Sequence, residues 1–320
     1  MKCRICDNQS GNKEHMVREM MFGTKEEFLY FECAHCGCLQ IAEIPENMGK
    51  YYPSNYTPFG MADSGSFIKK ALKRKRNEYA VFHKGILGRI IYLLYIKVPF
   101  NIDIIRDLNI TRDSKILDLG CGNGVALLYP LSQIGCRNLL GIDPFIKGDV
   151  SDGAVKIRKM FIRDLPEGET FDVIVFNHSL EHIPNQMETL DKIRILLSPN
   201  GVCLVRIPVK SEYIWGRYGV FSVQLDAPRH FFIHTTKSME ILADKAGLKI
   251  KDIRFDSTEF QFWGSEQCLR GIAYTAENSY LINPKKSIFS KKEIINFRQM
   301  ARELNRKKQG DQAAFYLVKA

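Results

Sequence analysis

The feature that most constrains the fold is a glycine-rich turn that directly follows a short apolar run. Lys115 to Leu119 has the pattern of a buried β-strand, and Gly120, Gly122 and Gly124 come immediately after it. Glycine lets the backbone turn sharply and lets its amides approach a ligand that side chains would otherwise exclude. A strand followed by such a turn and a helix is typical of a βαβ unit. The turn therefore predicts an α/β fold with a ligand at the end of this strand.

Strand and helix patterns alternate from residue 114 to the end of the chain. Six further β-rich runs follow the first strand, at 139–142, 156–161, 171–176, 201–207, 248–255 and 313–319. Helical stretches lie between them at 124–134, 187–197 and 236–246. The sequence therefore predicts an α/β domain built on a Rossmann-like sheet of seven strands that is mostly parallel.

Two acidic residues indicate which cofactor the turn accepts. A dinucleotide site needs the pattern G-x-G-x-x-G, but the third glycine here falls one residue early, at Gly124. Asp118 would repel a pyrophosphate, whereas it would attract the ammonium and sulfonium groups of S-adenosylmethionine (SAM). Asp143 closes the second strand, where an acid can accept hydrogen bonds from ribose hydroxyls. The pair favours SAM; the alternative is that both acids only cap local turns.

Four motifs in order carry a family resemblance: ILDLGCGNG (116–124), GIDP (141–144), FDVIVFNHSLEHIPN (171–185) and LSPNGVCLVRIP (197–208). Over roughly residues 110–260 the chain resembles the class I SAM-dependent methyltransferases. The resemblance implies that the seventh strand is antiparallel and that SAM lies over the carboxyl ends of strands one, two and four. The stretch 144–155 departs from the family pattern. By position, the resemblance assigns the methionine end to Asp118, Gly120, Cys121, Gly122 and Gly124, the ribose to Asp143, the adenine to Arg163 and Asp164, and the sulfonium to Asn177 and His178.

Three histidines are candidates for the base that takes a proton from the methyl acceptor, because histidine can accept protons near neutral pH. His178 and His182 lie in the run after the fourth strand, and His230 follows the fifth strand and an aromatic tract at 213–221. His182 is our first candidate, since the resemblance often places a histidine there. An anchoring role for His182 in its loop is the alternative.

Two further features of this region have competing interpretations. The run from His178 to His182 also matches H-x-x-E-H, an inverted zinc-protease motif, but Pro184 disfavours the helix that this chemistry needs. Arg229 could hold a phosphate or carboxylate of the substrate. An internal ion pair between Arg229 and Asp226 is the alternative.

Five of the nine cysteines lie in the first 60 residues. Two C-x-x-C pairs can present four thiolates tetrahedrally to Zn²⁺, and four thiolates leave no open position for catalysis. The sequence therefore predicts a structural zinc site, with reduced cysteines that bind no metal as the alternative. Its four predicted ligands are Cys3, Cys6, Cys33 and Cys36, and the substitutes are His15, His35 and Cys38.

The chain carries a net charge of +10, and the basic excess is concentrated at 69–76 and 302–308. A solvated helix is the favoured interpretation of the first run, and peripheral contact with an anionic membrane is the alternative. Nucleic acid is a less favoured partner, because stacking aromatic residues do not interleave with the basic run. No secretory leader is visible and no apolar window reaches about 18 residues, so the predicted compartment is the cytoplasm.

These features together predict a SAM-dependent methyltransferase. We divide the chain into a zinc-binding module at 1–60, a helical linker or cap at 61–110 and a methyltransferase domain at 111–320, with an inserted segment at about 262–310. Cysteine knuckles beside such a core resemble methyltransferases of bacterial surface-glycan pathways, so we expect a small-molecule acceptor, a hydroxyl of a nucleotide-linked sugar or glycan. The alternatives are a nucleic-acid or protein methyltransferase that docks through the zinc module and basic helix, and a non-catalytic SAM-binding module.

Overall fold

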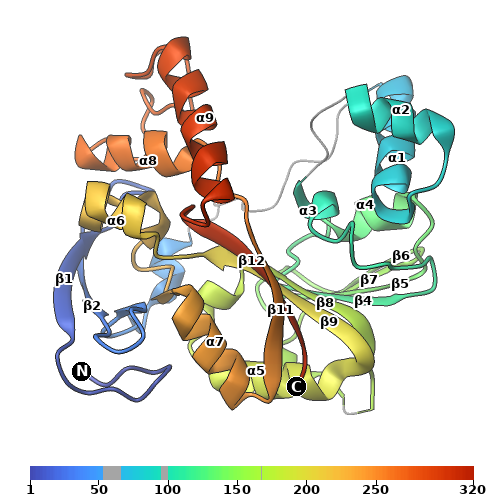
Figure 1. Ribbon diagram of the computed structural model, residues 1–320, viewed down its shortest axis with the longest axis horizontal. Coiled ribbons are helices and arrows are strands. Elements are labelled where there is room, and N and C mark those ends of the chain that lie inside the picture. Colours follow the sequence, from blue (N-terminus) through green and yellow to red (C-terminus); the bar gives the residue numbers. More distant parts are fainter. Residues whose placement is uncertain (53–65, 95–99, 167) are drawn as a thin grey trace. The chain divides into compact units, whose positions relative to one another are not determined.

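The computed structural model describes residues 1–52, 66–94, 100–166 and 168–320 (Figure 1). The chain forms two compact units, and it passes between them several times. The first unit comprises Met1–Pro53, Leu180–Met187 and Arg206–Phe315. The second comprises Ser54–Ser179, Glu188–Val205 and Tyr316–Ala320.

Parallel strands form the centre of the second unit. Strand β4 (Lys115–Leu119) pairs in parallel with β5 (Asn138–Ile142) and with β8 (Phe171–Asn177), and β5 pairs in parallel with β7 (Val155–Arg158). Four of the five residues of β4 are buried, as expected for a strand covered on both faces. The short strand β6 (Val150–Asp152) runs antiparallel to β7.

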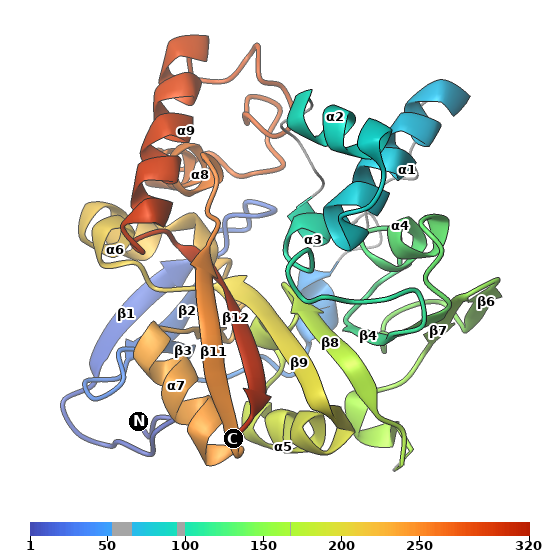
Figure 2. The ribbon, with the colours of Figure 1, turned by 45° about the vertical axis from the view of Figure 1, so that its right-hand side comes forward.

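The order of strands in this sheet is β11-β12-β9-β8-β4-β5-β7-β6 (Figure 2). Its remaining members are β9 (Leu197–Pro208), β11 (Leu248–Phe255) and β12 (Gln312–Lys319). Each of the seven predicted strands has a counterpart, and the last one lies between the fifth and the sixth. The predicted α/β fold with a mostly parallel sheet is confirmed. The eighth strand, β6, lies in the stretch 144–155, which departs from the family pattern and for which no strand was predicted.

Helices of the second unit are α1 (Phe67–Phe82), α2 (Ile86–Leu94), α3 (Phe100–Asp103), α4 (Leu128–Gln133) and most of α5 (Gln186–Leu196). Helix α4 is shorter than the predicted 124–134, because the glycine turn continues to Leu127 before the helix begins. The turn η2 (Ile162–Asp164) follows β7.

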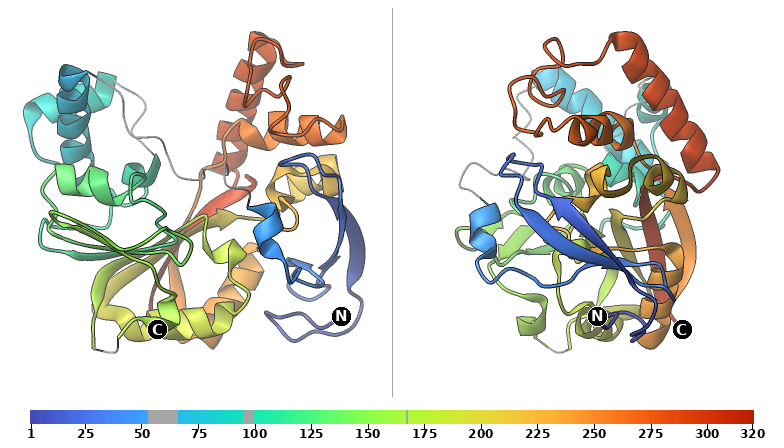
Figure 3. Two further views of the ribbon diagram at one scale, coloured as in Figure 1. Left: turned by 180° about the vertical axis from the view of Figure 1, so that it is seen from behind. Right: turned by 90° about the vertical axis from the view of Figure 1, so that its left-hand side faces the viewer.

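A small antiparallel sheet in the first unit contains the N-terminal strands (Figure 3). Its order is β1 (Lys13–Arg18), β2 (Glu27–Glu32), β3 (Leu39–Ile41) and β10 (Phe232–Ile233). Phe232 of β10 pairs with Gln40 of β3, so a segment nearly two hundred residues later in the chain completes this sheet. The cysteine-rich N-terminus is therefore built together with the region around residue 230.

The rest of the first unit is mainly helical. Its helices and short turns are η1 (Met48–Tyr51), η3 (Leu180–His182), α6 (Glu212–Tyr218), η4 (Gly219–Phe221), η5 (Val223–Leu225), α7 (Thr236–Lys245), α8 (Phe260–Leu269) and α9 (Lys291–Arg306). Tyr218, Phe262, Trp263 and Phe297 pack together in one core cluster. Helix α9 lies within residues 262–310, and Ser290 and Glu293 cap its start reciprocally.

Helix α8 was not predicted. Its buried residues lie on nearly all sides of the helix, so the sequence has no one-sided apolar stripe that would mark it as amphipathic. Within the described ranges, none of the helices has both the length and the apolar character needed to cross a membrane.

Candidate functional site

The glycine turn lies at the carboxyl end of β4. This is where the sequence predicts that a ligand binds. Gly120, Gly122 and Gly124 have φ angles of 72°, 54° and 73°, a left-handed conformation that favours glycine. A Cβ atom on Gly120 would lie 2.6 Å from the Cβ of Ser179, just after β8, and the Ser179 hydroxyl donates to the Leu119 carbonyl at 2.7 Å. The glycine therefore lets the ends of two neighbouring strands meet.

Asp118 and Asp143 form a buried acidic pair beside this turn, with 4% and 5% of their surfaces exposed. The Asp143 carboxylate accepts hydrogen bonds from the Gly122 amide at 3.0 Å and the Phe145 amide at 2.8 Å. Burial, assisted by the charge of Asp143, raises the pKa of Asp118 to about 7. Two desolvated carboxylates repel each other, so a bound cation would be favoured here.

Cys121 and Gly141 pack the turn against β5. The Cys121 thiol donates to the Gly122 carbonyl at 3.4 Å and is buried. A Cβ on Gly141 would lie 2.5 Å from the Cys121 sulfur, so this strand position needs a glycine. The contributions of Ser179 and Gly141 were not predicted, although both residues belong to the motifs that carry the resemblance.

The remaining predicted cofactor residues lie at the ends of β7 and β8. Arg163 and Asp164 are exposed in η2, where the Arg163 guanidinium lies 4.5 Å from the centre of the Phe161 ring. Asn177 ends β8 and is half-buried. His178 follows with φ of 55°, a conformation that costs a non-glycine residue about 1–3 kcal/mol. The second unit thus contains all the predicted cofactor residues.

Residues 97–253 match a family model described as a methyltransferase domain. This segment covers β4 to β9, the glycine turn and both acids, in the strand order described above. The chain carries a methyltransferase domain.

Curated relatives of this methyltransferase domain are similar over part of the chain. Over 109 residues it is 29% identical to the ubiquinone biosynthesis O-methyltransferase of Bradyrhizobium diazoefficiens, covering 32% of this chain and 42% of that protein. Over 198 residues it is 24% identical to the mitochondrial ubiquinone biosynthesis O-methyltransferase of Homo sapiens, covering 55% and 53%. The chain spans about half the length of the curated relatives it matches. A solved SAM-dependent methyltransferase from Archaeoglobus fulgidus has 19% identity and a TM-score of 0.39, over 65% of this chain and 86% of that chain.

His182 and His230 lie together in the first unit, whereas His178 belongs to the second. Their ring centres are 4.8 Å apart. The Nδ1 atom of His182 lies 2.7 Å from the Arg229 carbonyl, and that of His230 lies 2.7 Å from the Gln224 carbonyl. A carbonyl can only accept, so each Nδ1 donates and each Nε2 keeps its lone pair. In its neutral form, each imidazole of this pair therefore presents a basic Nε2 atom.

Acidic side chains surround this histidine pair. The Nε2 atom of His230 lies 4.0 Å from an oxygen of Glu181 and 3.8 Å from an oxygen of Asp226. Burial lowers the pKa of His182, against the opposing effect of the Glu181 charge. One ligand atom from each of Glu181, His182 and His230 lies within 4.8 Å of the others, so the group can share protons or hold a cation.

The inverted zinc-protease interpretation is wrong. Leu180–His182 forms a single 3-10 turn, and helix α5 begins only at Gln186. His178 stands outside both elements in a left-handed conformation. The two histidines of the motif therefore do not lie on one sustained helix, as that chemistry requires.

Arg229 is occupied by internal partners. Its guanidinium is fully buried and pairs with Asp226 at 2.6 Å and with Glu19 at 3.0 Å. It also donates to the Tyr51 carbonyl at 3.2 Å. These partners raise the pKa of Arg229 above its usual value, against the effect of burial. The internal ion pair is confirmed, and the guanidinium is not exposed to a substrate.

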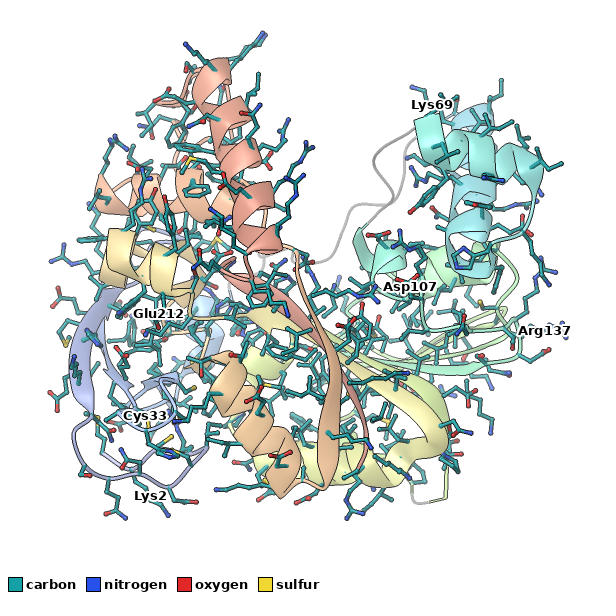
Figure 4. All side chains as sticks on the ribbon, in the orientation of Figure 1. Lys2, Cys33, Lys69, Asp107, Arg137 and Glu212 are labelled. Atoms are coloured by element: carbon teal, nitrogen blue, oxygen red, sulfur yellow. The ribbon has the colours of Figure 1, made fainter. Side chains whose placement is uncertain are left out.

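The four predicted zinc ligands converge in the N-terminal module, where Cys33 is labelled in Figure 4. The sulfurs of Cys3 and Cys36 are 3.7 Å apart, those of Cys6 and Cys33 are 3.5 Å apart, and all four lie within 4.8 Å of one another. A tetrahedral site with Zn–S bonds of about 2.3 Å has S–S edges of about 3.8 Å. The arrangement therefore fits a zinc ion.

Neighbouring donors suit a thiolate at Cys3. The Cys3 sulfur accepts from the amide nitrogens of Ile5 at 3.4 Å and Cys6 at 3.5 Å, and from the Gln40 side chain at 2.9 Å. All nine cysteines are free. The substitute ligands lie elsewhere: His15 pairs with Glu32, His35 is exposed, and the Cys38 thiol donates to the Leu39 carbonyl.

Proposed function

We propose that this protein transfers the methyl group of SAM to a hydroxyl oxygen of a small-molecule acceptor. The observation that carries the proposal is the buried pair of Asp118 and Asp143 beside the glycine turn. In the part of the chain that the structure describes, no lysine or arginine pairs with either carboxylate. The ammonium of SAM would supply the missing positive charge, and SAM brings no phosphate that would oppose these acids.

Each residue of the turn has a role in this proposal. Asp118, Gly120, Cys121, Gly122 and Gly124 would hold the methionine end of SAM. Asp143 would bind the ribose, because each of its oxygens can accept another hydrogen bond besides the one from a backbone amide. We assign the adenine side to Arg163 and Asp164, and the sulfonium side to Asn177 and His178. SAM supplies an activated methyl group when bound.

The histidine pair is our proposed base. A hydroxyl oxygen becomes a stronger nucleophile as it loses its proton, and a neutral imidazole can take that proton. His182 is the first choice, because burial lowers its pKa and so favours the neutral imidazole, and its Nδ1 bond leaves Nε2 basic. His230 and His178 are the second and third. Replacement of His182 by Gln would lower kcat while leaving SAM affinity unchanged, and added imidazole would restore part of the rate.

Two acceptor classes are proposed. The first is a hydroxyl of a nucleotide-linked sugar or glycan, on the strength of the combined cysteine module and methyltransferase core. The second is a phenolic hydroxyl, favoured by the relatives named as ubiquinone biosynthesis O-methyltransferases. Fold alone does not select an acceptor. A screen of SAM consumption with nucleotide sugars, phenols, nucleic acids and peptides separates these classes from a nucleic-acid or protein methyltransferase.

We also propose that Cys3, Cys6, Cys33 and Cys36 bind one structural zinc ion. The Thr235 hydroxyl donates to the Cys36 carbonyl at 2.6 Å, so the second knuckle is tied to the start of α7. Metal analysis should find about one zinc per chain. Cys6→Ser should lose it, whereas Cys38→Ser should keep it.

Calorimetric titration with SAM tests the central proposal. Wild-type protein should bind SAM, and Asp118→Ala should bind at least about a hundredfold more weakly, because the variant removes a buried charge opposite the ammonium. Asp113→Ala is the matched control, since Asp113 is exposed in the same unit. Equal binding by Asp118→Ala and the control, or no binding by the wild type, would refute a SAM pocket at this turn.

A further inference from the structure

Helices α1 and α2 of the second unit carry an exposed surface that the proposed methyl-transfer residues do not use. The two helices lie side by side (Figure 1). We call this exposed surface the α1–α2 surface and define it by two sets of exposed residues. Its apolar set is Ile86, Leu87, Ile90, Leu93 and Leu94, and its basic set is Lys69, Lys70, Arg74, Lys84 and Arg89.

The apolar set forms one continuous stripe along α2. Its members follow the spacing i, i+1, i+4, i+7 and i+8, and at 100° per residue they cover an arc of about 120°. Ile86 is 82% exposed and Leu94 is 74% exposed, which is unusual for such large apolar side chains. The stripe is an amphipathic helix face turned toward solvent.

Packing within the unit uses the opposite side of α2. Gly88 and Ile91 are buried, and a Cβ on Gly88 would lie 2.5 Å from the Lys75 carbonyl of α1. Gly88 thus permits close contact between the two helices. Because this contact fixes α2 on α1, the packing of the two helices leaves the apolar stripe unused.

Basic residues predominate in α1 and α2. Between residues 66 and 94 the chain has eight basic residues and one acidic residue, Glu78, which pairs with Lys75 and with Arg112. Figure 4 shows Lys69 in the α1–α2 part of the unit. A helix with an exposed apolar face beside lysine and arginine is typical of segments that lie in the interface of an anionic membrane.

We propose that the α1–α2 surface docks this protein onto an anionic phospholipid bilayer. The apolar stripe would enter the boundary between headgroups and acyl chains, while the basic residues would contact lipid phosphates. Nucleic acid would match the charge but not five aliphatic side chains. A second copy of the same surface would match the aliphatic side chains but would bring like charges together.

Sedimentation of the full-length protein with vesicles tests the proposal. We expect binding to vesicles of phosphatidylcholine mixed with phosphatidylserine, weak binding to phosphatidylcholine alone, and release as salt is raised. The triple variant Ile86→Ser, Leu87→Ser, Leu94→Ser should bind at least about tenfold more weakly. Its control is Leu281→Ser with Ile282→Ser, which changes two aliphatic residues of similar exposure in the first unit.

A charge variant separates the two contributions. Lys69→Gln, Lys70→Gln and Arg74→Gln together should weaken binding and reduce its salt dependence, whereas Lys291→Gln with Lys292→Gln at the start of α9 should not. Circular dichroism confirms folding of each variant, and all should bind SAM like the wild type.

Three results would overturn membrane docking: no vesicle binding by the wild type, equal loss in the control variants, or light scattering that shows a dimer dissolved by the triple variant. Salt-dependent RNA binding in the absence of vesicle binding would also overturn it.

Discussion

Each unit of this protein buries a pair of acidic residues, and the two pairs differ in what neutralises them. In the first unit, Glu19 and Asp226 share the buried guanidinium of Arg229. That guanidinium helps to lower the pKa of Asp226, although burial alone would raise it. In the second unit, Asp118 and Asp143 lie together beside the glycine turn, and the pKa of Asp118 rises to about 7. The first pair shares a buried cation, whereas in the described residues no lysine or arginine pairs with the second, for which we propose a cationic ligand.

The difference separates a structural ion pair from a ligand site. Burying a carboxylate costs free energy unless a positive partner or hydrogen bonds compensate. Glu19 and Arg229 come from segments about two hundred residues apart, so their contact ties the N-terminal module to the segment that carries His230. We propose that the positive charge of a bound ligand compensates Asp118, and its raised pKa makes it a functional candidate.

The largest expected effect on stability comes from removing the guanidinium that Glu19 and Asp226 share. Arg229→Met should lower the free energy of unfolding by about 3–5 kcal/mol, because it leaves Glu19 and Asp226 buried without a positive partner. Urea denaturation measures this loss. Arg18→Met, which removes an exposed ion pair with Glu27, is the control and should cost at most about 1 kcal/mol. Equal, small effects of the two variants would contradict the structural role of Arg229.

Removal of a charge from the pair of Asp118 and Asp143 should instead raise the free energy of unfolding. Asp118→Asn removes a buried charge that lies beside Asp143, so without ligand it should raise the free energy of unfolding at pH 8 by about 2–4 kcal/mol. Differential denaturation of the ligand-free proteins measures the change. Asp113→Asn, at an exposed site, should leave stability unchanged within about 0.5 kcal/mol. Destabilisation by Asp118→Asn would show that the acid is compensated by the protein itself.

The contrast between these pairs also shows what local sequence can reveal. The glycine turn, Asp118 and Asp143 belong to one βαβ unit, so spacing along the chain was enough to predict the strands and to select SAM as the cofactor class. The grouping of the four cysteines was likewise predictable, because each short C-x-x-C pair presents two sulfurs at a spacing that suits one metal ion.

Contacts between distant segments could not be predicted from the sequence. The ion pair of Arg229 with Asp226 was one of two predicted alternatives, but its second partner, Glu19, lies 210 residues away and was not predicted. The pairing of β10 with β3 and the meeting of Ser179 with Gly120 have the same character. Pattern rules describe one element at a time, whereas these contacts depend on which elements the fold brings together.

The pH dependence of SAM binding tests the proposed role of Asp118 directly. In the proposed complex, the ammonium of SAM would bind the ionised form of Asp118, whose pKa is about 7 without ligand. Below that pH, binding must release a proton, so SAM affinity should fall up to about tenfold per pH unit between pH 7 and 5. Calorimetry in buffers of different ionisation enthalpy measures both the affinity and the released proton. Asp118→Asn should bind weakly with no such slope, and a wild-type affinity independent of pH would contradict the role of Asp118.

The smallest effect concerns a third way to bury an ionisable group, which is to keep it neutral. His234 is fully buried between Ser238 and Gln186, at 2.9 and 2.8 Å, and burial lowers its pKa to about 3. Below about pH 6.5 the unfolded chain binds a proton that folded His234 does not, so stability should fall as the pH decreases from 6.5 toward 3.

Between pH 6 and 5 this residue should remove about 1 kcal/mol from the free energy of unfolding. His234→Gln lacks the titrating group, so the difference in stability between wild type and variant should change by that amount over the interval, whatever Asp118 and other acids contribute to both. His35→Gln, at an exposed site, should follow the wild type. A constant difference for His234→Gln would mean that this imidazole is protonated in the folded protein, and that a nearby acid such as Glu181 compensates it as Asp226 compensates Arg229.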